Sequence, residues 1–251
     1  MEAVQTAPQR KFRKDYREPD YWVREVELEF DLGEDETLVR SRMRIERNDK
    51  ADADAPLFLH GRGLEPRGFR LDGAELVEGR WFATDEGVEV PGVPASFVLE
   101  TLVAIRPQDN TSLMGLYRAG GTFCTQCEAE GFRKITWFVD RPDNMARFTV
   151  TIRGDKARCP VMLSNGNRVA ERDLGDGRHE VRWVDPYPKP SYLFALVAGD
   201  LRRHAGDFRT RGPRRRPRDL GRAAANTTGA STPSPALRKA MAWDEERWPR
   251  A

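Results

Sequence analysis

Hydrophobic and polar residues alternate with a period of two along much of the first 200 residues of the chain. In residues 26–32 the apolar side chains alternate with acidic ones, and in residues 39–45 they alternate with arginines. A period of two places one set of side chains on a buried face of a β-strand and the other set on a solvent face. The two runs therefore predict a hairpin in which acidic and basic side chains meet across the outer face.

Further strands are predicted by short apolar runs between turn signals. One inward stripe is formed by Phe97, Leu99, Thr101, Val103 and Ile105, and the other runs are 148–152, 161–163, 179–183 and 192–198. Asp72-Gly73 is a typical two-residue hairpin turn. Asn165-Gly166-Asn167 predicts another hairpin, between 161–163 and a strand at Val169. Short strands with frequent turns predict an all-β fold, an antiparallel β-sandwich or a saddle of sheets.

The pattern changes after Thr210. Residues 212–235 are rich in arginine, proline, serine and threonine, and Leu220 is their one large apolar residue. Such a segment cannot contribute to a hydrophobic core, so we expect it to be disordered.

Helix-forming residues return in 236–251, where Leu237, Met241 and Trp248 are spaced for one helical face. This spacing predicts a short C-terminal helix at the truncated end of the chain. The expected organisation is a disordered N-terminus (1–11), a β domain (12–211), a disordered segment (212–235) and the helix (236–251).

Composition narrows the classes of partner. The chain has 42 Lys and Arg against 40 Asp and Glu, a net charge of +2, whereas a nucleic-acid-binding domain carries a strong basic excess. The arginine-rich segment 202–222 has no amphipathic period, and Phe208 is its one candidate for base stacking. We therefore interpret this segment as a solvated tail and expect no nucleic-acid partner.

Targeting signals are also missing from the sequence. No run approaches eighteen apolar residues, so no membrane span is expected, and the first residues lack the apolar core of a signal peptide. Three cysteines are an odd number and do not describe a disulfide framework, which favours a reducing compartment. These features predict a cytoplasmic protein.

Residues 124–143 combine a Cys-x-x-Cys pair, several acidic residues and an aromatic turn. The pair Cys124 and Cys127 is compatible with a redox site or half of a zinc site. A zinc site needs two more ligands at suitable spacing, which Cys159, His60, His179 and His204 do not offer. A redox pair is expected at a helix start, which the pattern does not predict here. We interpret the pair as loop cysteines, the histidines as surface or turn residues, and expect no metal or cofactor in this chain.

Several motifs resemble, in the same order, the N-terminal domain of bacterial aminopeptidase N, a family of zinc metallopeptidases that includes alanyl aminopeptidase. The similarity begins at 12–21, and its markers are 111–117, 124–143, 163–169, 185–190 and 192–200. It ends at about Thr210, is absent from 212–235 and returns at 241–247. We interpret this interruption as a frameshift near codon 212, with recovery before about codon 237 and a second shift or stop after Arg247.

The resemblance implies that Gln126 and Glu128 contact the first residue of a substrate. A carboxylate on a fixed loop gives a free α-ammonium group a charge-assisted hydrogen bond, which an internal peptide cannot match. A glutamine amide adds an acceptor and donors beside it. The alternative is that Glu128 and Glu130 are solvated acids paired with Arg133 or Lys134. Asp140 and Asp143 are expected to be structural, as acceptors of local backbone N–H groups.

The zinc motif of the family, His-Glu-x-x-His, does not occur in the 251 residues. The resemblance therefore implies the substrate-anchoring part of an enzyme that removes N-terminal amino acids from peptides, with zinc held by a missing catalytic domain. We expect the chain alone to be inactive and to contain no catalytic residue. The alternative is a non-catalytic β-sandwich module that binds a partner through its loops.

Overall fold

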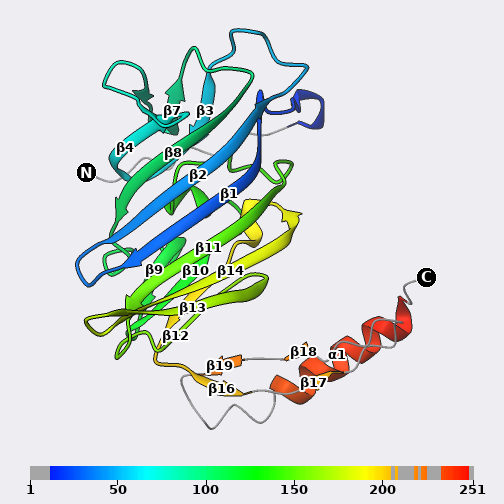
Figure 1. Cartoon of the computed structure of the whole chain (residues 1–251). Helices are drawn as coiled ribbons and strands as arrows, with labels where there is room; N and C mark the ends of the chain where they lie inside the picture. The colour runs from blue at the N-terminus through cyan, green and yellow to red at the C-terminus, as the bar shows by residue number, and fades with distance from the viewer. Residues whose placement is uncertain (1–11, 205–206, 209–217, 220–221, 225–232, 249–251) are drawn as a thin grey trace, which may run out of the picture.

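The computed structural model describes residues 12–204, 207–208, 218–219, 222–224 and 233–248 (Figure 1). Its largest element is an eight-stranded sheet with the order β13-β14-β11-β1-β2-β8-β4-β5. The strands are β1 (Tyr21–Leu32), β2 (Thr37–Arg47), β4 (Glu65–Leu71), β5 (Ala74–Glu75), β8 (Ser96–Ile105), β11 (Ala146–Asp155), β13 (Asn167–Gly175) and β14 (Arg178–Lys189). The prediction of an all-β fold is confirmed.

The β1–β2 hairpin forms as the alternating pattern predicts. Glu25 lies opposite Arg44 and Glu27 opposite Arg42 on the outer face, and the two ion pairs measure 3.6 and 3.8 Å. The apolar residues that alternate with these charged ones in β1 and β2, such as Val26, Phe30 and Met43, are buried on the inner face. Burial of this face, rather than the exposed ion pairs, supplies most of the stabilisation, because exposed pairs contribute only about 0–1 kcal/mol.

One strand pairing differs from the antiparallel expectation. β1 pairs with β11 in the parallel direction, whereas every other described pairing in this sheet is antiparallel. A parallel pair requires a long connection, and more than 100 residues separate β1 from β11. The large sheet is therefore mixed.

Two smaller sheets complete the domain. The four-stranded sheet has the order β12-β15-β10-β9, and the three-stranded sheet has the order β3-β7-β6. Their strands are β3 (Leu57–His60), β6 (Phe82–Ala83), β7 (Gly87–Val90), β9 (Gly115–Ala119), β10 (Thr122–Gln126), β12 (Val161–Ser164) and β15 (Leu196–Gly199). Buried side chains from all three sheets belong to one hydrophobic cluster, so the sheets enclose a common core.

The prediction of a hairpin at Asn165-Gly166-Asn167 is wrong. β12 pairs with β15, and β13 pairs with β14, so this turn links two sheets. The Asn165 side chain explains the difference, because its amide donates to the Leu193 carbonyl at 3.0 Å and its oxygen accepts from the Ala195 N–H at 2.7 Å. The strand predicted over 192–198 is also shorter, because a 3₁₀ turn, η3 (Ser191–Leu193), precedes β15.

The C-terminal part contains β16 (Arg202–His204), β17 (Asp207–Phe208), β18 (Arg218–Asp219), β19 (Arg222–Ala224) and the helix α1 (Pro233–Arg247). The helix is confirmed and begins three residues before its predicted start, because proline fits the first helical turn. Residues 1–11 and most of 212–235, both predicted to be disordered, lie outside the described residues. Within 212–235, β18 pairs with β17 and β19 pairs with β16. Backbone pairing of this kind needs no apolar side chain.

No helix in the described parts of the chain has the length and hydropathy needed to cross a bilayer.

Candidate functional site

Gln126 and Glu128 lie together where the β9–β10 hairpin ends. Gln126 is the last residue of β10 and pairs with Gly115 of β9, and Glu128 lies in the turn that follows. The Gln126 side-chain amide donates to the Glu128 carbonyl at 3.0 Å. Both side chains are exposed, and the Glu128–Ala129 peptide bond is cis. The structure therefore brings the two predicted residues side by side on an accessible turn.

Gly131 closes this turn through close backbone contacts. Its N–H donates to the Cys127 carbonyl at 2.8 Å. A Cβ atom added to Gly131 would lie 2.2 Å from the Gln126 carbonyl oxygen and 3.0 Å from the Gly115 nitrogen. The space at Gly131 is thus filled by the backbone that carries Gln126, and the position of the turn is tightly defined.

The two acidic residues of the turn are in different environments. Glu130 forms an ion pair with Arg133 at 3.5 Å, whereas the Glu128 carboxylate makes no hydrogen bond or ion pair with any residue that the structure describes. Lys134 donates to the Ser112 hydroxyl at 2.7 Å instead. The alternative interpretation of the two acids, pairing with Arg133 or Lys134, therefore applies to Glu130, and Glu128 has a carboxylate available for a ligand.

Behind the turn lies a buried ion pair between Arg133 and Asp140. Their side chains are 7% and 1% exposed, and Nε of Arg133 lies 3.0 Å from Oδ2 of Asp140. Arg133 also donates from its backbone N–H to Oδ2 at 3.1 Å and from its guanidinium to the Asp140 carbonyl at 3.0 Å. The Ser191 hydroxyl donates to Oδ1 at 2.5 Å. These contacts agree with the expected structural role of Asp140 as an acceptor of a local N–H. The additional contact with Ser191, 51 residues away in the sequence, has no counterpart in the prediction.

His60 contacts Asp140 of the same pair and is half-buried. Its Nδ1 accepts from the Asp140 N–H at 3.3 Å, and its backbone exchanges hydrogen bonds of 2.8 and 3.1 Å with Phe138. Burial lowers the pKa of His60 below its ordinary value, and the Arg133 charge lowers it further. His179 is buried, with its ring nitrogen within 2.8 Å of the Cys159 carbonyl, so the prediction of a surface or turn residue is wrong for His179. An isolated histidine in a strand carries no sequence signal for such a contact.

Aromatic side chains anchor the segment that follows the turn. Phe132, in the 3₁₀ turn η2 (Phe132–Lys134), is fully buried. Its ring lies 5.0 Å from that of Phe138, 5.9 Å from that of Phe148 and 5.2 Å from that of Phe194. Edge-to-face rings add about 0.5–1.5 kcal/mol per pair to the burial of their area. The turn is therefore held to the common core at one end and to β10 at the other.

Neither cysteine of the Cys-x-x-Cys pair has the properties of a reactive thiol. Burial, with a contribution from the Asp140 charge, raises the pKa of Cys127 to about 12, and burial also raises the pKa of Cys124. Both are free cysteines. A thiolate is the form that attacks a disulfide or binds a metal. The interpretation of Cys124 and Cys127 as structural loop residues agrees with these environments.

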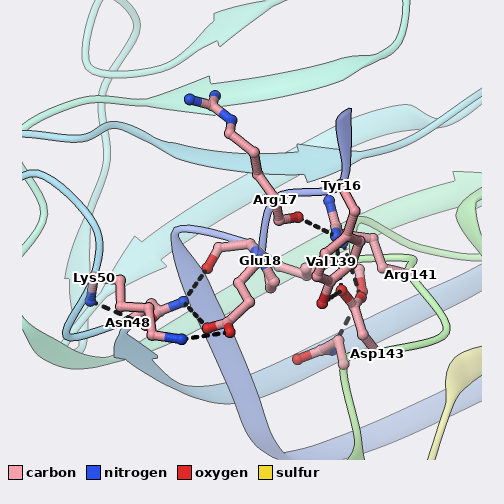
Figure 2. Close-up of polar contacts among 10 residues, drawn as sticks. Tyr16, Arg17, Glu18, Asn48, Lys50, Val139, Arg141 and Asp143 are labelled. Atoms are coloured by element: carbon pink, nitrogen blue, oxygen red, sulfur yellow. Dashed lines mark hydrogen bonds and ion pairs between the residues drawn. The ribbon is translucent and has the colours of Figure 1, made fainter. Parts of the chain in front are cut away.

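The N-terminal segment is fastened to the turn that ends residues 124–143 (Figure 2). The Tyr16 hydroxyl donates to Asp143 at 2.9 Å, and Arg141 donates to the Arg17 carbonyl at 2.7 Å. Hydrogen bonds from Arg141, and then from Tyr16, lower the pKa of Asp143. On the other side of the segment, Glu18 pairs with Lys50 at 2.6 Å. Asp143 thus has the structural role that was expected, mainly through the side chains of Arg141 and Tyr16.

Two pockets lie away from the turn. One, of about 190 Å³, is lined by His60, Arg141 and the start of β1, and the other, of about 270 Å³, is lined by Arg118, Cys159 and Arg178 among others. Neither Gln126 nor Glu128 lines these pockets. In the described residues the two side chains therefore lie on an open surface, outside both pockets.

Comparison with known proteins identifies related sequences. The family model of the Peptidase M1 N-terminal domain matches residues 97–193. Aminopeptidase N of Escherichia coli is 43% identical over 244 residues, which are 96% of this chain and 27% of that protein. Aminopeptidase N of Haemophilus influenzae is 40% identical over 240 residues, which are 95% of this chain and 27% of that protein. The chain thus spans little more than a quarter of the length of these relatives.

Solved structures show the same fold. The crystal structure of Legionella pneumophila aminopeptidase A in complex with aspartic acid matches with a TM-score of 0.85 and 32% identity, over 94% of this chain and 28% of that one. A mutant of an M1 zinc metallopeptidase from Deinococcus radiodurans matches with a TM-score of 0.74 at 19% identity, over 88% of this chain and 52% of that one. The second likeness concerns the fold alone.

Proposed function

We propose that the chain is the substrate-anchoring part of a zinc-dependent aminopeptidase, because the model of the Peptidase M1 N-terminal domain matches residues 97–193 and aminopeptidase N of Escherichia coli is 43% identical to the chain. In this role it binds the amino end of a peptide while a separate domain cleaves the first peptide bond. The partners are accordingly the peptide N-terminus and the catalytic domain.

The observation that carries the proposal is that one acidic side chain of the turn, Glu130, is paired with an arginine, whereas the other, Glu128, is not. Glu130 is engaged by Arg133 at 3.5 Å, and the adjacent Glu128 presents a carboxylate with no partner in the described residues. The Gln126 amide, which donates to the Glu128 carbonyl at 3.0 Å, lies beside it. A free α-ammonium group has three N–H donors, and a carboxylate with an amide oxygen next to it can accept two of them.

This arrangement selects the end of a peptide. An internal peptide N–H has no charge, so it forms the weaker neutral hydrogen bond, whereas a charged one contributes about 1.5–3 kcal/mol. Glu128 therefore favours substrates with a free amino terminus. Gln126 orients that terminus, so that only the first peptide bond reaches the cleavage site.

Zinc is not held by these residues. The described parts of the chain contain no group of three or more histidine, cysteine or acidic side chains placed to hold a metal ion, so they do not fit the zinc that the family implies. We therefore assign the metal to the separate catalytic domain and assign no catalytic residue to this chain. The chain alone is expected to lack peptidase activity.

A chimeric enzyme tests the proposal. Residues 12–204 of this chain replace the matching N-terminal segment of Escherichia coli aminopeptidase N, and hydrolysis of alanine amide substrates is measured. The proposal requires an active chimera in which Glu128→Gln lowers kcat/KM at least about tenfold and Glu130→Gln has a much smaller effect. If the chimera folds correctly and Glu128→Gln leaves its kcat/KM unchanged, the alternative is favoured, in which this chain is a non-catalytic binding module.

We also propose that the protein works in the cytoplasm, in the breakdown of peptides. The support is its cysteine usage, because Cys124, Cys127 and Cys159 are all free thiols, which suits a reducing compartment. Fractionation of the source cells, followed by immunodetection of the chain, tests this location.

A further inference from the structure

We propose that Arg133 and Asp140, together with Ser191, are positioning residues that fix the turn carrying Gln126 and Glu128. The inference rests on the proposed role of Glu128, but it concerns residues that do not touch the substrate. Its basis is a buried charge network that joins the turn to two distant segments of the chain.

The first step is that the network connects to the turn itself. Arg133 lies three residues after Glu130, and its guanidinium reaches the Glu130 carboxylate at 3.5 Å. The same guanidinium donates to the Asp140 carbonyl at 3.0 Å, and its Nε donates to the Asp140 carboxylate at 3.0 Å. Arg133 therefore links a side chain of the turn to a residue beyond it, with the planar geometry that only a guanidinium supplies.

The second step is that Asp140 is itself held from three directions. Oδ2 accepts from the Arg133 backbone N–H, Oδ1 accepts from Ser191, and the Asp140 N–H donates to His60. Ser191 belongs to η3, and His60 ends β3. Residues far apart in the sequence thus converge on Asp140, Ser191 at its carboxylate and His60 at its backbone N–H, and Asp140 is a fixed anchor for Arg133.

The third step is that stability alone is a weak explanation of this arrangement. The Arg133 and Asp140 side chains are 7% and 1% exposed, and burying two charges carries a desolvation penalty that often exceeds their attraction. A well-packed apolar pair of similar volume is commonly as stable. What the ion pair provides and an apolar pair does not is a directional connection from a fixed anchor to Glu130.

The functional consequence follows from the geometry of charge recognition. A group that binds a substrate charge must be held within about 0.5 Å of its working position. Glu128 has no side-chain partner of its own in the described residues, so its position depends on the backbone of the turn. Because Arg133 holds the turn at Glu130, Arg133 also sets the position of the Glu128 backbone. The Glu128 carboxylate stays free to bind a ligand.

Hydrogen exchange of the 251-residue chain tests the inference without a substrate. In Arg133→Lys the charge remains but the fork geometry is lost. We expect the amides of Gly131 and Lys134, which donate to Cys127 and Gly131, to exchange at least about tenfold faster, with unchanged amides in β1 and β2. Arg153→Lys is the matched control, because Arg153 bridges Glu29 and Glu180 on the large sheet. Arg153→Lys should leave the exchange rates of the Gly131 and Lys134 amides within about twofold of their values in the unmodified chain.

Unchanged exchange at Gly131 and Lys134 in Arg133→Lys would overturn the inference. An equal acceleration at the turn and in β1 and β2 would also overturn it, because that result describes a purely structural role. If Arg133→Lys does not fold, Ser191→Ala is used instead, because it removes one donor to Asp140 with a smaller change. Faster exchange at Gly131 and Lys134 than in β1 and β2 then supports the inference, and equal or unchanged exchange overturns it.

The two proposals fail separately. In the chimera, Arg133→Lys should reduce the preference for a free over an acetylated amino terminus about tenfold, because Glu128 is no longer aligned with the charge. If Glu128→Gln has no effect on the chimera while Arg133→Lys loosens the turn, the proposed function is wrong and the positioning role stands. If Glu128→Gln is impaired while Arg133→Lys leaves both the preference and the exchange unchanged, the positioning role is wrong.

Discussion

Replacing Gly131 with alanine is a sharp perturbation of the candidate site, because the backbone conformation permits alanine but the surrounding space does not. Gly131 has φ −83° and ψ −21°, a region open to any residue. An added Cβ would lie 2.2 Å from the Gln126 carbonyl oxygen and 2.9 Å from the Cys127 Cα, where ordinary contacts begin at 3.4 Å. The backbone of Gln126 must therefore move by about 1 Å.

The size of the effect follows from this displacement. Overpacking of this kind costs about 1–3 kcal/mol of stability, and a misplacement of about 1 Å in a binding group can cost about 100-fold in rate. We expect Gly131→Ala to lower the urea midpoint of the chain modestly and to reduce kcat/KM of the chimera about 100-fold. The loss of activity should exceed what the loss of stability explains, since the folded fraction stays near one.

Gly68→Ala is the matched control. A Cβ at Gly68 meets nothing within 4 Å, and Gly68 lies in β4, away from the turn. Its effect on stability should be within about 1 kcal/mol, with no change in activity. A Gly131→Ala chimera with the activity of the unmodified chimera would refute the reasoning, because it would mean that the position of Gln126 is not set by this contact.

The remaining predictions concern the core, the buried thiol and His60. Phe132→Ala should cost about 3–5 kcal/mol in urea unfolding, whereas Phe82→Ala, at a ring that is 51% exposed, should cost much less; equal costs would mean that Phe132 does not anchor the turn. With its pKa raised to about 12, the Cys127 thiol should react with a thiol reagent at pH 8 only on unfolding, and labelling of the native chain at Cys127, followed by mass spectrometry, would contradict its burial. Because the pKa of His60 is lowered in the folded state, the unfolded chain takes up this proton first, so its contribution to stability is complete above about pH 6.5 and is lost as the pH falls below that value. His60→Gln should flatten this part of the pH dependence of the urea midpoint, and an unaltered pH profile would show that His60 does not titrate in this way.

The strands were predictable where burial imposes a period of two. The β1–β2 hairpin and its cross-strand charges follow directly from such a pattern, since a slip of one residue would expose the whole buried set. The parallel pairing of β1 with β11 was not predictable, because sequence pattern does not show which distant strands become neighbours. The turn at Asn165 was misassigned for the same reason, as its side chain bonds to residues near Leu193 that are distant in sequence.

The candidate site divides in a similar way. Gln126 and Glu128 were identified from a resemblance, and their proximity follows from their spacing. The difference between Glu128 and Glu130 depends on which of them reaches the guanidinium of Arg133, which spacing alone left open. The convergence of His60, Asp140 and Ser191 brings together three separate parts of the chain. It is a property of the folded structure and has no local signal.

The central claim, that Glu128 binds the charge of an α-ammonium group, is most directly tested by a thermodynamic cycle on the chimera. Inhibition constants are measured for a substrate-like amine and for the analogue with a hydroxyl in place of the amine, with and without Glu128→Gln. The account predicts a coupling free energy of about 1.5–3 kcal/mol, a tenfold or larger effect on the amine beyond that on the hydroxyl analogue. Glu130→Gln should show little coupling. A coupling near zero for Glu128→Gln, or a large one for Glu130→Gln, would contradict the account.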